Sequence, residues 1–177
     1  MTHDELKALV RTVPDFPARG IQFRDISTLI ADPRGLAGCI ELLAELAPAD
    51  TRTIAGIEAR GFIFGAALAA RLGAGFIPVR KAGKLPVATI GVDYALEYGQ
   101  SRIEIDPSLI ALNQPVLLVD DLIATGGTAF AAAQLLRHAG ARVEHALFVI
   151  DLPELGGADR LRAANLTSTA LIAFDGH

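Results

Sequence analysis

Two adjacent carboxylates followed by a threonine-flanked glycine pair are the residues of this chain best suited to chemistry. They lie in the segment VLLVDDLIATGGT, residues 116–128. Asp120 and Asp121 can accept hydrogen bonds from neighbouring hydroxyl groups. Residues 125–128 offer backbone N–H groups and hydroxyls at the start of an alanine-rich helical segment, which favours anion binding. Carboxylates beside a phosphate-binding loop predict a site for a phosphorylated sugar.

Two widespread nucleotide-binding motifs do not fit this segment. A Walker loop needs a lysine after its glycines, whereas Thr128 follows Gly126 and Gly127 here. The chain also has no G-x-G-x-x-G dinucleotide pattern. The plainer alternative is an ordinary strand-to-helix turn with two solvated aspartates. The binding site is favoured because the acidic pair, the glycine pair and the flanking periodicities all agree with it.

Two further clusters place cations where strands are expected to end. Arg60 follows the expected strand Thr53–Ile57, and a guanidinium beside a glycine can bind pyrophosphate with its planar fork. The second cluster surrounds a glycine after the expected strand 76–80 and contains Arg80, Lys81 and Lys84. It suits a lid that closes over a polyanion. Either cluster could instead be a solvated surface, and the helix dipole slightly disfavours a cation at the start of a helix.

The N-terminal segment DFPARGIQFRD, residues 15–25, is a candidate for binding a planar ring. Phe23 could stack on a heterocycle while the neighbouring backbone groups read its edge by hydrogen bonds. The alternative is a core phenylalanine in an extended N-terminal arm.

The elements that must position these residues are expected to alternate between strands and helices, which predicts a parallel α/β sheet. Expected strands are 53–57, 76–80, 116–119, 143–150 and 169–174. Expected helices begin at Pro33 after an Asp32 cap and end before Pro48, run over 61–72 up to Gly73, and run over 128–139 up to Gly140. Asp120, Asp121 and Arg60 would then meet at the carboxyl edge of the sheet, where open α/β sheets bind ligands.

The alternation breaks in an insertion at about residues 81–106. Residues 82–91 are rich in Gly, Pro and Lys, and residues 94–105 are expected to form a hairpin that turns at Gly99. An irregular insertion inside a compact domain is more often functional than accidental. We therefore expect one domain over 1–177 with a flexible lid.

Composition limits the possible partners and locations. A chain of 177 residues suffices for one domain with a sizeable core. No apolar run reaches membrane-spanning length, and Asp4, Glu5 and Lys7 interrupt any secretory signal. The lone Cys39 is expected to be a buried free thiol. A net charge of −4 gives no basic surface for nucleic acid. These features predict a cytoplasmic protein that binds neither membrane nor nucleic acid.

The motifs FPARGIQFRDIS, GIEARGFIFG, VRKAGKLP, YALEYG and VDDLIATGGT occur in this order along the chain. With this order and spacing, the chain resembles the adenine phosphoribosyltransferases, type I phosphoribosyltransferases, along nearly its whole length. The resemblance implies a central, mainly parallel sheet flanked by helices, with a lid or hairpin insertion and a small N-terminal hood. It implies that adenine and phosphoribosyl pyrophosphate (PRPP) give AMP and pyrophosphate, assisted by Mg²⁺, in a homodimer.

The same resemblance implies roles for individual residues. The ribose hydroxyls would be bound by Asp120 and Asp121, and the 5′-phosphate by Ala124, Thr125, Gly126, Gly127 and Thr128. Pyrophosphate would be bound by Arg60, Arg80, Lys81 and Lys84. Adenine would lie between Phe23 and Leu152, with the backbone of Gln22 and Arg24 reading N6 and N1. Glu97 and Tyr98 would lie beside the reacting ring, and Mg²⁺ would be held mainly by PRPP and water.

Ala124 distinguishes this chain from the related hypoxanthine-guanine enzymes, which resemble it but carry an acidic residue at that position. Alanine cannot move a proton, so another group must do so, and Glu97 is the candidate. Two alternatives stay open. One is the same enzyme class acting on xanthine or hypoxanthine, against which Ala124 and the LEYG segment weigh. The other is a nucleic-acid-binding regulator with a PRPP fold, against which the acidic charge and the intact lid weigh.

Overall fold

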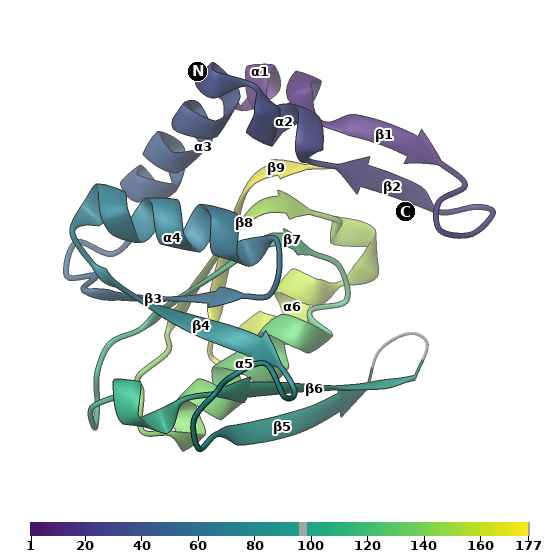
Figure 1. Cartoon of the computed structure of the whole chain (residues 1–177). Coiled ribbons are helices and arrows are strands. Elements are labelled where there is room, and N and C mark those ends of the chain that lie inside the picture. Colours follow the sequence, from purple (N-terminus) through teal and green to yellow (C-terminus); the bar gives the residue numbers. More distant parts are fainter. Residues whose placement is uncertain (96–98, 177) are drawn as a thin grey trace.

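The computed structural model describes residues 1–95 and 99–176 and has a single large sheet at its centre (Figure 1). The strands of this sheet are β3 (Thr53–Ile57), β4 (Gly75–Lys81), β5 (Ile90–Ala95), β6 (Gln100–Ile105), β7 (Leu117–Ile123), β8 (His145–Asp151) and β9 (Thr167–Ala173). Their spatial order is β5-β6-β4-β3-β7-β8-β9. β6 runs antiparallel to β4 and β5, and the other pairs are parallel. The predicted α/β class with a mainly parallel sheet is confirmed.

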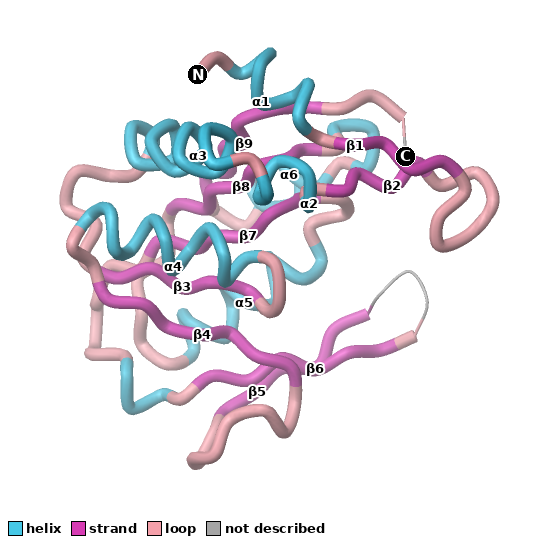
Figure 2. Tube along the Cα trace, turned by 45° about the horizontal axis from the view of Figure 1, so that its top comes forward, coloured by secondary structure: helices cyan, strands magenta, loops and turns pink. Residues whose placement is uncertain are grey.

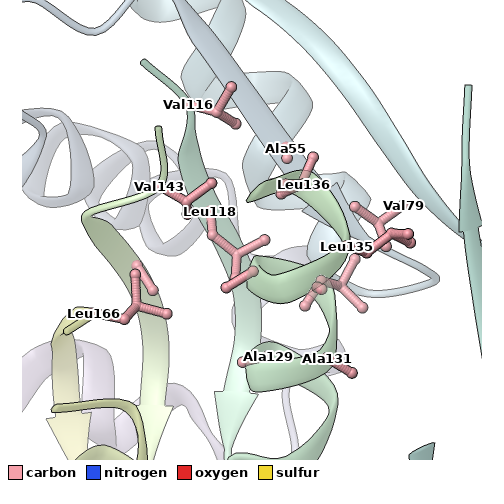
Figure 3. Packing of buried hydrophobic residues seen from close by; sticks show 14 of the residues in the cluster. Ala55, Val79, Val116, Leu118, Ala129, Ala131, Leu135, Leu136, Val143 and Leu166 are labelled. Carbon is pink, nitrogen blue, oxygen red and sulfur yellow. The ribbon is translucent and has the colours of Figure 1, made fainter. Parts of the chain in front are cut away.

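Helices cover both faces of this sheet. One face carries α3 (Pro33–Leu46) and α4 (Gly61–Leu72), and the other carries α5 (Gly127–His138) and α6 (Gly157–Ala163). Residues of β7 alternate between the two hydrophobic clusters, with Leu117 in one and Leu118 in the other. Figure 3 shows Leu118 packed beside α5. No helix in the described part of the chain is both long and apolar enough to cross a membrane.

The predicted helix ends on the first of these faces are confirmed by their caps. The Asp32 carboxylate accepts hydrogen bonds from the backbone N–H groups of Arg34 (2.9 Å) and Gly35 (2.7 Å), and Pro33 occupies the first turn of α3. α4 ends at Gly73, whose φ of 65° is left-handed. Cys39 on α3 is buried, and burial raises the pKa of its thiol to about 12, which confirms the expected inert thiol.

The N-terminal segment forms a small layer beside the main sheet, as expected for a hood. It consists of α1 (His3–Leu9), β1 (Arg11–Pro14), β2 (Gln22–Asp25) and α2 (Ser27–Ala31). β1 and β2 pair as a separate antiparallel two-stranded sheet where an extended arm was the alternative. Figure 2 shows this ribbon beyond the ends of β7 and β8.

The insertion folds as the predicted hairpin, and it joins the sheet. β5 and β6 pair over their whole length, and β6 also pairs with the end of β4. The hairpin starts at Ile90, earlier than expected. Residues 96–98, between the two strands in the sequence, lie outside the described residues. In both views the hairpin and the β1–β2 ribbon extend from the same side of the molecule (Figures 1 and 2).

Strand β7 is longer than predicted, so the expectation that Asp120 and Asp121 follow its end is wrong. Pairing between β7 and β3 stops at Val119, but pairing with β8 continues to Ile123. The aspartates therefore lie inside a strand that has lost its neighbour on one side. Smaller differences are that α5 begins and ends one residue earlier than expected, that β8 covers 145–151 and that β9 covers 167–173.

The sequence reasoning missed helix α6. Its N-cap is Gly156 with a left-handed φ of 71°, and no side chain caps its first turn. A sequence search for a Ser, Thr, Asp or Asn cap therefore finds no signal at this position.

Candidate functional site

A cavity of about 320 Å³ lies at the carboxyl edge of the sheet. Its walls come from the ends of β3 and β4, the hairpin, and the segment that joins β7 to α5. The lining residues are Ile57, Glu58, Ala59, Arg60, Lys81, Tyr94, Ser101 and the continuous run 120–129. The predicted acidic pair, phosphate loop, Arg60 and Lys81 are therefore brought together in one place.

The cavity exists because neighbouring strands end at different levels. β3 leaves the sheet at Ile57 and leads into α4, whereas β7 continues for several residues. Gly61, the first residue of α4, lets that helix approach β7 closely. A Cβ at Gly61 would lie 2.6 Å from Asp120 Oδ1 and 3.0 Å from the carbonyl oxygen of Val119. The Arg-Gly pair thus sets Arg60 directly beside the aspartates.

The two aspartates form an electrostatically strained pair. Burial raises the pKa of Asp120 well above its usual range, and repulsion by Asp121 adds to this. Burial also raises the pKa of Asp121, although the Arg60 guanidinium opposes the shift from 3.0 Å. Asp121 Oδ2 is buried, and within the described part of the chain Arg60 Nε forms an ion pair with it without the geometry of a hydrogen bond. A ligand that supplies hydrogen-bond donors or positive charge would therefore stabilise the ionised form of this pair.

The phosphate loop presents the N-terminus of α5 to the cavity. The N-cap of α5 is Gly126, with a left-handed φ of 74°, so no cap side chain occupies the first N–H groups. These groups and the positive end of the helix dipole suit a phosphate. The backbone of Gly157 in α6 packs directly against this loop and supports it. A Cβ at Gly157 would lie 2.3 Å from the Ala124 carbonyl oxygen and 2.8 Å from the Gly126 nitrogen.

Gly157→Ala is expected to displace the phosphate loop. The added methyl group would meet backbone atoms, which cannot rotate away, so we expect a loss of about 1–3 kcal/mol in unfolding free energy and a raised KM for PRPP. Thermal unfolding and steady-state kinetics measure both. Gly75→Ala is the matched control, since the nearest atom to its Cβ position is 3.8 Å away. Equal behaviour of the two variants would contradict the bracing role.

Three residues near the loop were missed by sequence reasoning. Tyr94 and Ser101, on the two strands of the hairpin, line the cavity, and no sequence signal separates them from ordinary strand residues. Arg160 of α6 reaches the start of α5 from outside. Its Nη1 atom lies 3.5 Å from the Cβ position of Gly127, and its guanidinium lies 5.2 Å from the Phe130 ring centroid.

The predicted pyrophosphate cations do not all face the cavity. Lys81 lines it, whereas the neighbouring Arg80 donates to Glu58 Oε2 (3.1 Å) and to the Lys84 carbonyl oxygen (3.2 Å). Glu58 was also missed. Burial would raise the pKa of Glu58, but hydrogen bonds from Lys81 N (2.9 Å) and Arg80 outweigh burial and lower it. In this conformation Glu58 therefore holds Arg80 at the rim.

The predicted base-binding residues Gln22, Phe23, Arg24 and Leu152 do not line this cavity; the first three belong to the hood and Leu152 follows β8. The Phe23 ring centroid lies 5.6 Å from Arg60 Cζ, and Phe16 packs edge-on against Phe23 at 5.1 Å. β2, which carries Gln22 and Arg24, pairs with β1 alone among the described strands, so one backbone edge is open. Leu152 is buried directly after β8, and its N–H donates to the Ile123 carbonyl oxygen (3.0 Å). The candidates Glu97 and Tyr98 lie outside the described residues.

Comparisons with known proteins agree with this geometry. A family model described as a phosphoribosyl transferase domain matches residues 25–168. An adenine phosphoribosyltransferase of Novosphingobium aromaticivorans is 69% identical, with 100% of both chains covered. The crystal structure of adenine phosphoribosyltransferase from Thermoanaerobacter pseudethanolicus is similar at a TM-score of 0.92 and 44% identity, covering 98% of this chain and 100% of that chain.

A further similar structure contains ligands. The adenine phosphoribosyltransferase of Saccharomyces cerevisiae, solved with adenine and an imino-altritol bisphosphate, has a TM-score of 0.88 at 38% identity, covering 96% of this chain and 98% of that chain. The site, the fold and these relatives agree: the chain belongs to the phosphoribosyltransferase family and, within it, to the adenine phosphoribosyltransferases.

Proposed function

We propose that this chain transfers the 5-phosphoribosyl group of PRPP to adenine, giving AMP and pyrophosphate in purine salvage. The observation that carries the proposal is the cavity itself. It combines a carboxylate pair for ribose hydroxyls, a phosphate loop at a helix N-terminus and Arg60, whose guanidinium lies 5.6 Å from the ring centroid of Phe23, a residue outside the cavity lining. Relatives of this chain named adenine phosphoribosyltransferase, one of them crystallised with adenine, support the same activity.

The proposed roles follow from where charge develops. As the bond from ribose C1′ to pyrophosphate breaks, the sugar gains positive character and the leaving group gains negative charge. Arg60 and Lys81, which line the cavity, would stabilise the leaving group more in the transition state than in the ground state. The residues 124–128 would hold the 5′-phosphate. Arg80 and Lys84 would join Arg60 and Lys81 at the pyrophosphate if Arg80 exchanged its contact with Glu58 for one with the ligand.

We propose that PRPP binds together with Mg²⁺. The residues fit such an ion, because Asp121 presents a buried carboxylate at the cavity whose Oδ2 atom, although ion-paired with Arg60, meets no hydrogen-bond geometry with residues 1–95 and 99–176. No three His, Cys, Asp or Glu side chains within those ranges lie close enough to hold a metal by themselves. PRPP and water would therefore supply most of the ligands. When bound, the ion neutralises charge on the pyrophosphate group.

The insertion at about 81–106 is proposed to act as a lid on a single catalytic domain. Lys81, Tyr94 and Ser101 already line the cavity from this segment. A lid would exclude water, which competes with adenine for the activated sugar. We propose Glu97, assisted by Tyr98, as the group that handles the proton of adenine, because Ala124 supplies no acid or base at the loop.

The decisive test of the function is adenine-dependent formation of AMP from PRPP and Mg²⁺, with pyrophosphate release measured in parallel. Guanine, hypoxanthine and xanthine are the comparison bases. We expect kcat/KM for adenine to exceed the others by about 10²-fold or more, because a 6-oxo group leaves the base-reading groups mispaired. An equal kcat/KM for hypoxanthine would contradict the proposal that adenine is the specific substrate. Nucleic-acid binding in a filter assay without AMP formation would favour a regulator.

We further propose a homodimer that acts in the cytoplasm, with the Arg60 region near the interface. Ile63, one turn from Arg60 on α4, is 38% exposed and so is available for such a contact. A buried, free Cys39 is compatible with a reducing compartment. Sedimentation equilibrium measures the oligomeric state, and a monomer at micromolar concentration would contradict the dimer. Cell fractionation tests the location.

A further inference from the structure

The side chain of Arg24 is buried although it belongs to a ribbon at the surface, and it is 9% exposed. It donates hydrogen bonds to Thr12 Oγ1 (2.6 Å) and to the carbonyl oxygens of Asp175 (2.8 Å) and Gly176 (3.1 Å). Its guanidinium also lies 4.6 Å from the Phe174 ring centroid. Within the described ranges no carboxylate lies within 4.0 Å of it. Arg24 is therefore held by residues 174–176 and by Thr12.

Residues 174–176 are themselves fixed to the main sheet. They follow β9 directly, and the Phe174 N–H donates to the carbonyl oxygen of Asp151 at the end of β8 (3.0 Å). The Phe174 ring also lies 4.9 Å from Lys7 Nζ, which ties α1 to the same point. Leu152, the proposed adenine contact, is the next residue after Asp151. Residues 174–176 thus connect the hood to the strand end that carries half of the proposed base site.

This connection fixes the strand that is proposed to read the base. A two-stranded ribbon is marginally stable by itself, so its position depends on what anchors it. Successive side chains of a strand point to opposite faces. Arg24 points toward its anchor, and the adjacent Phe23 ring lies 5.6 Å from Arg60 Cζ at the cavity. The anchor therefore determines where Phe23 and the backbone of β2 stand relative to the ribose site.

We propose that Arg24 and Phe174 are positioning residues for adenine. Their contact fixes the position of β2 relative to the PRPP site and thereby determines the affinity for the base. The inference rests on the proposed function, since it assumes that adenine binds along β2. Neither side chain needs to touch a substrate. Neither residue lines the cavity that holds the phosphate loop, so PRPP affinity should be independent of them.

The test is a kinetic comparison of Arg24→Met and Phe174→Leu in the full chain. We expect KM for adenine to rise about tenfold in each, since both variants lose the cation–π contact and Arg24→Met also loses charge-assisted hydrogen bonds. KM for PRPP should stay within about twofold. Turnover at saturating adenine should stay within about threefold, which also shows that the variants fold. The double variant should raise the adenine KM no further than Arg24→Met alone, because Arg24→Met already removes the contact with the Phe174 ring.

Two controls belong to the same elements. Arg11→Met removes a cation of β1 that pairs with Asp25, and Phe174→Tyr keeps the ring; both should leave the adenine KM unchanged. If the wild-type protein forms no AMP, the proposed function fails. If it forms AMP but both test variants keep the wild-type adenine KM, the positioning role is wrong. If the KM values for adenine and PRPP rose together, the contact would serve only the general stability of the fold, and the positioning role would also be wrong. Should Arg24→Met fail to fold, Phe174→Leu decides alone.

Discussion

Asp120→Asn is expected to lower kcat/KM for PRPP by about 100-fold while making the ligand-free protein more stable. The lost activity follows from weaker acceptance of the ribose hydroxyls, since hydrogen bonds to charged groups exceed neutral ones by about 1–2 kcal/mol each. The amide keeps the shape of the side chain, and its oxygen can still accept the 2.9 Å hydrogen bond from Asp121 N. The ion pair between Arg60 and Asp121 is also retained.

The gain in stability follows from the sign of the pKa shift. Burial and the neighbouring Asp121 raise the pKa of Asp120, so the folded chain binds its proton more tightly than the unfolded chain does. Stability is then greatest below the unfolded pKa and falls as pH rises through the folded pKa. Asparagine has no charge to bury. We expect the variant to be about 1–2 kcal/mol more stable at neutral pH, which corresponds to roughly 2–8 °C in Tm.

Tm measured against pH tests this account. The curves of wild type and Asp120→Asn should converge at acidic pH and separate as pH rises. Asp50→Asn, an exposed aspartate at the opposite edge of the sheet, should give no such separation. A lower Tm for Asp120→Asn than for the wild type at neutral pH would show that the buried charge does not destabilise the protein. A near-normal kcat/KM for PRPP would show that the charge is not needed for ligand binding.

Glu97→Gln is expected to lower kcat by about 10²–10³-fold and to change KM for PRPP by a few-fold at most. A carboxylate in reach of the ring can share or take the adenine proton, and such assistance contributes about 10²–10⁴-fold in rate. Glutamine keeps the size but cannot do this. Steady-state kinetics with both substrates gives the separation of kcat from KM. Glu45→Gln on the exposed side of α3 is the matched control, and turnover of Glu97→Gln near the wild-type value would remove Glu97 from this role.

The sequence was sufficient to predict those elements whose determinants lie within one short segment. Residues 53–57 and 61–72 were predicted with the bounds that the structure has, because a short apolar run and a helix closed by Gly73 are complete in their own segments. The Asp32 cap is equally local. The phosphate loop could be recognised because its chemistry comes from consecutive residues. The order and spacing of five motifs then identified the family.

Tertiary structure alone decided how the segments meet. The sequence does not show that β7 continues past its aspartates, because that depends on pairing with β8 after β3 has left. It does not show that Glu58 holds Arg80, or that Gly157 stands behind Gly126. In the sequence, Arg24 is one residue of a base-binding motif, yet two of its side-chain hydrogen-bond partners lie about 150 positions away. Local patterns encode which residue types a segment offers, whereas long-range packing determines the partners that each side chain finds.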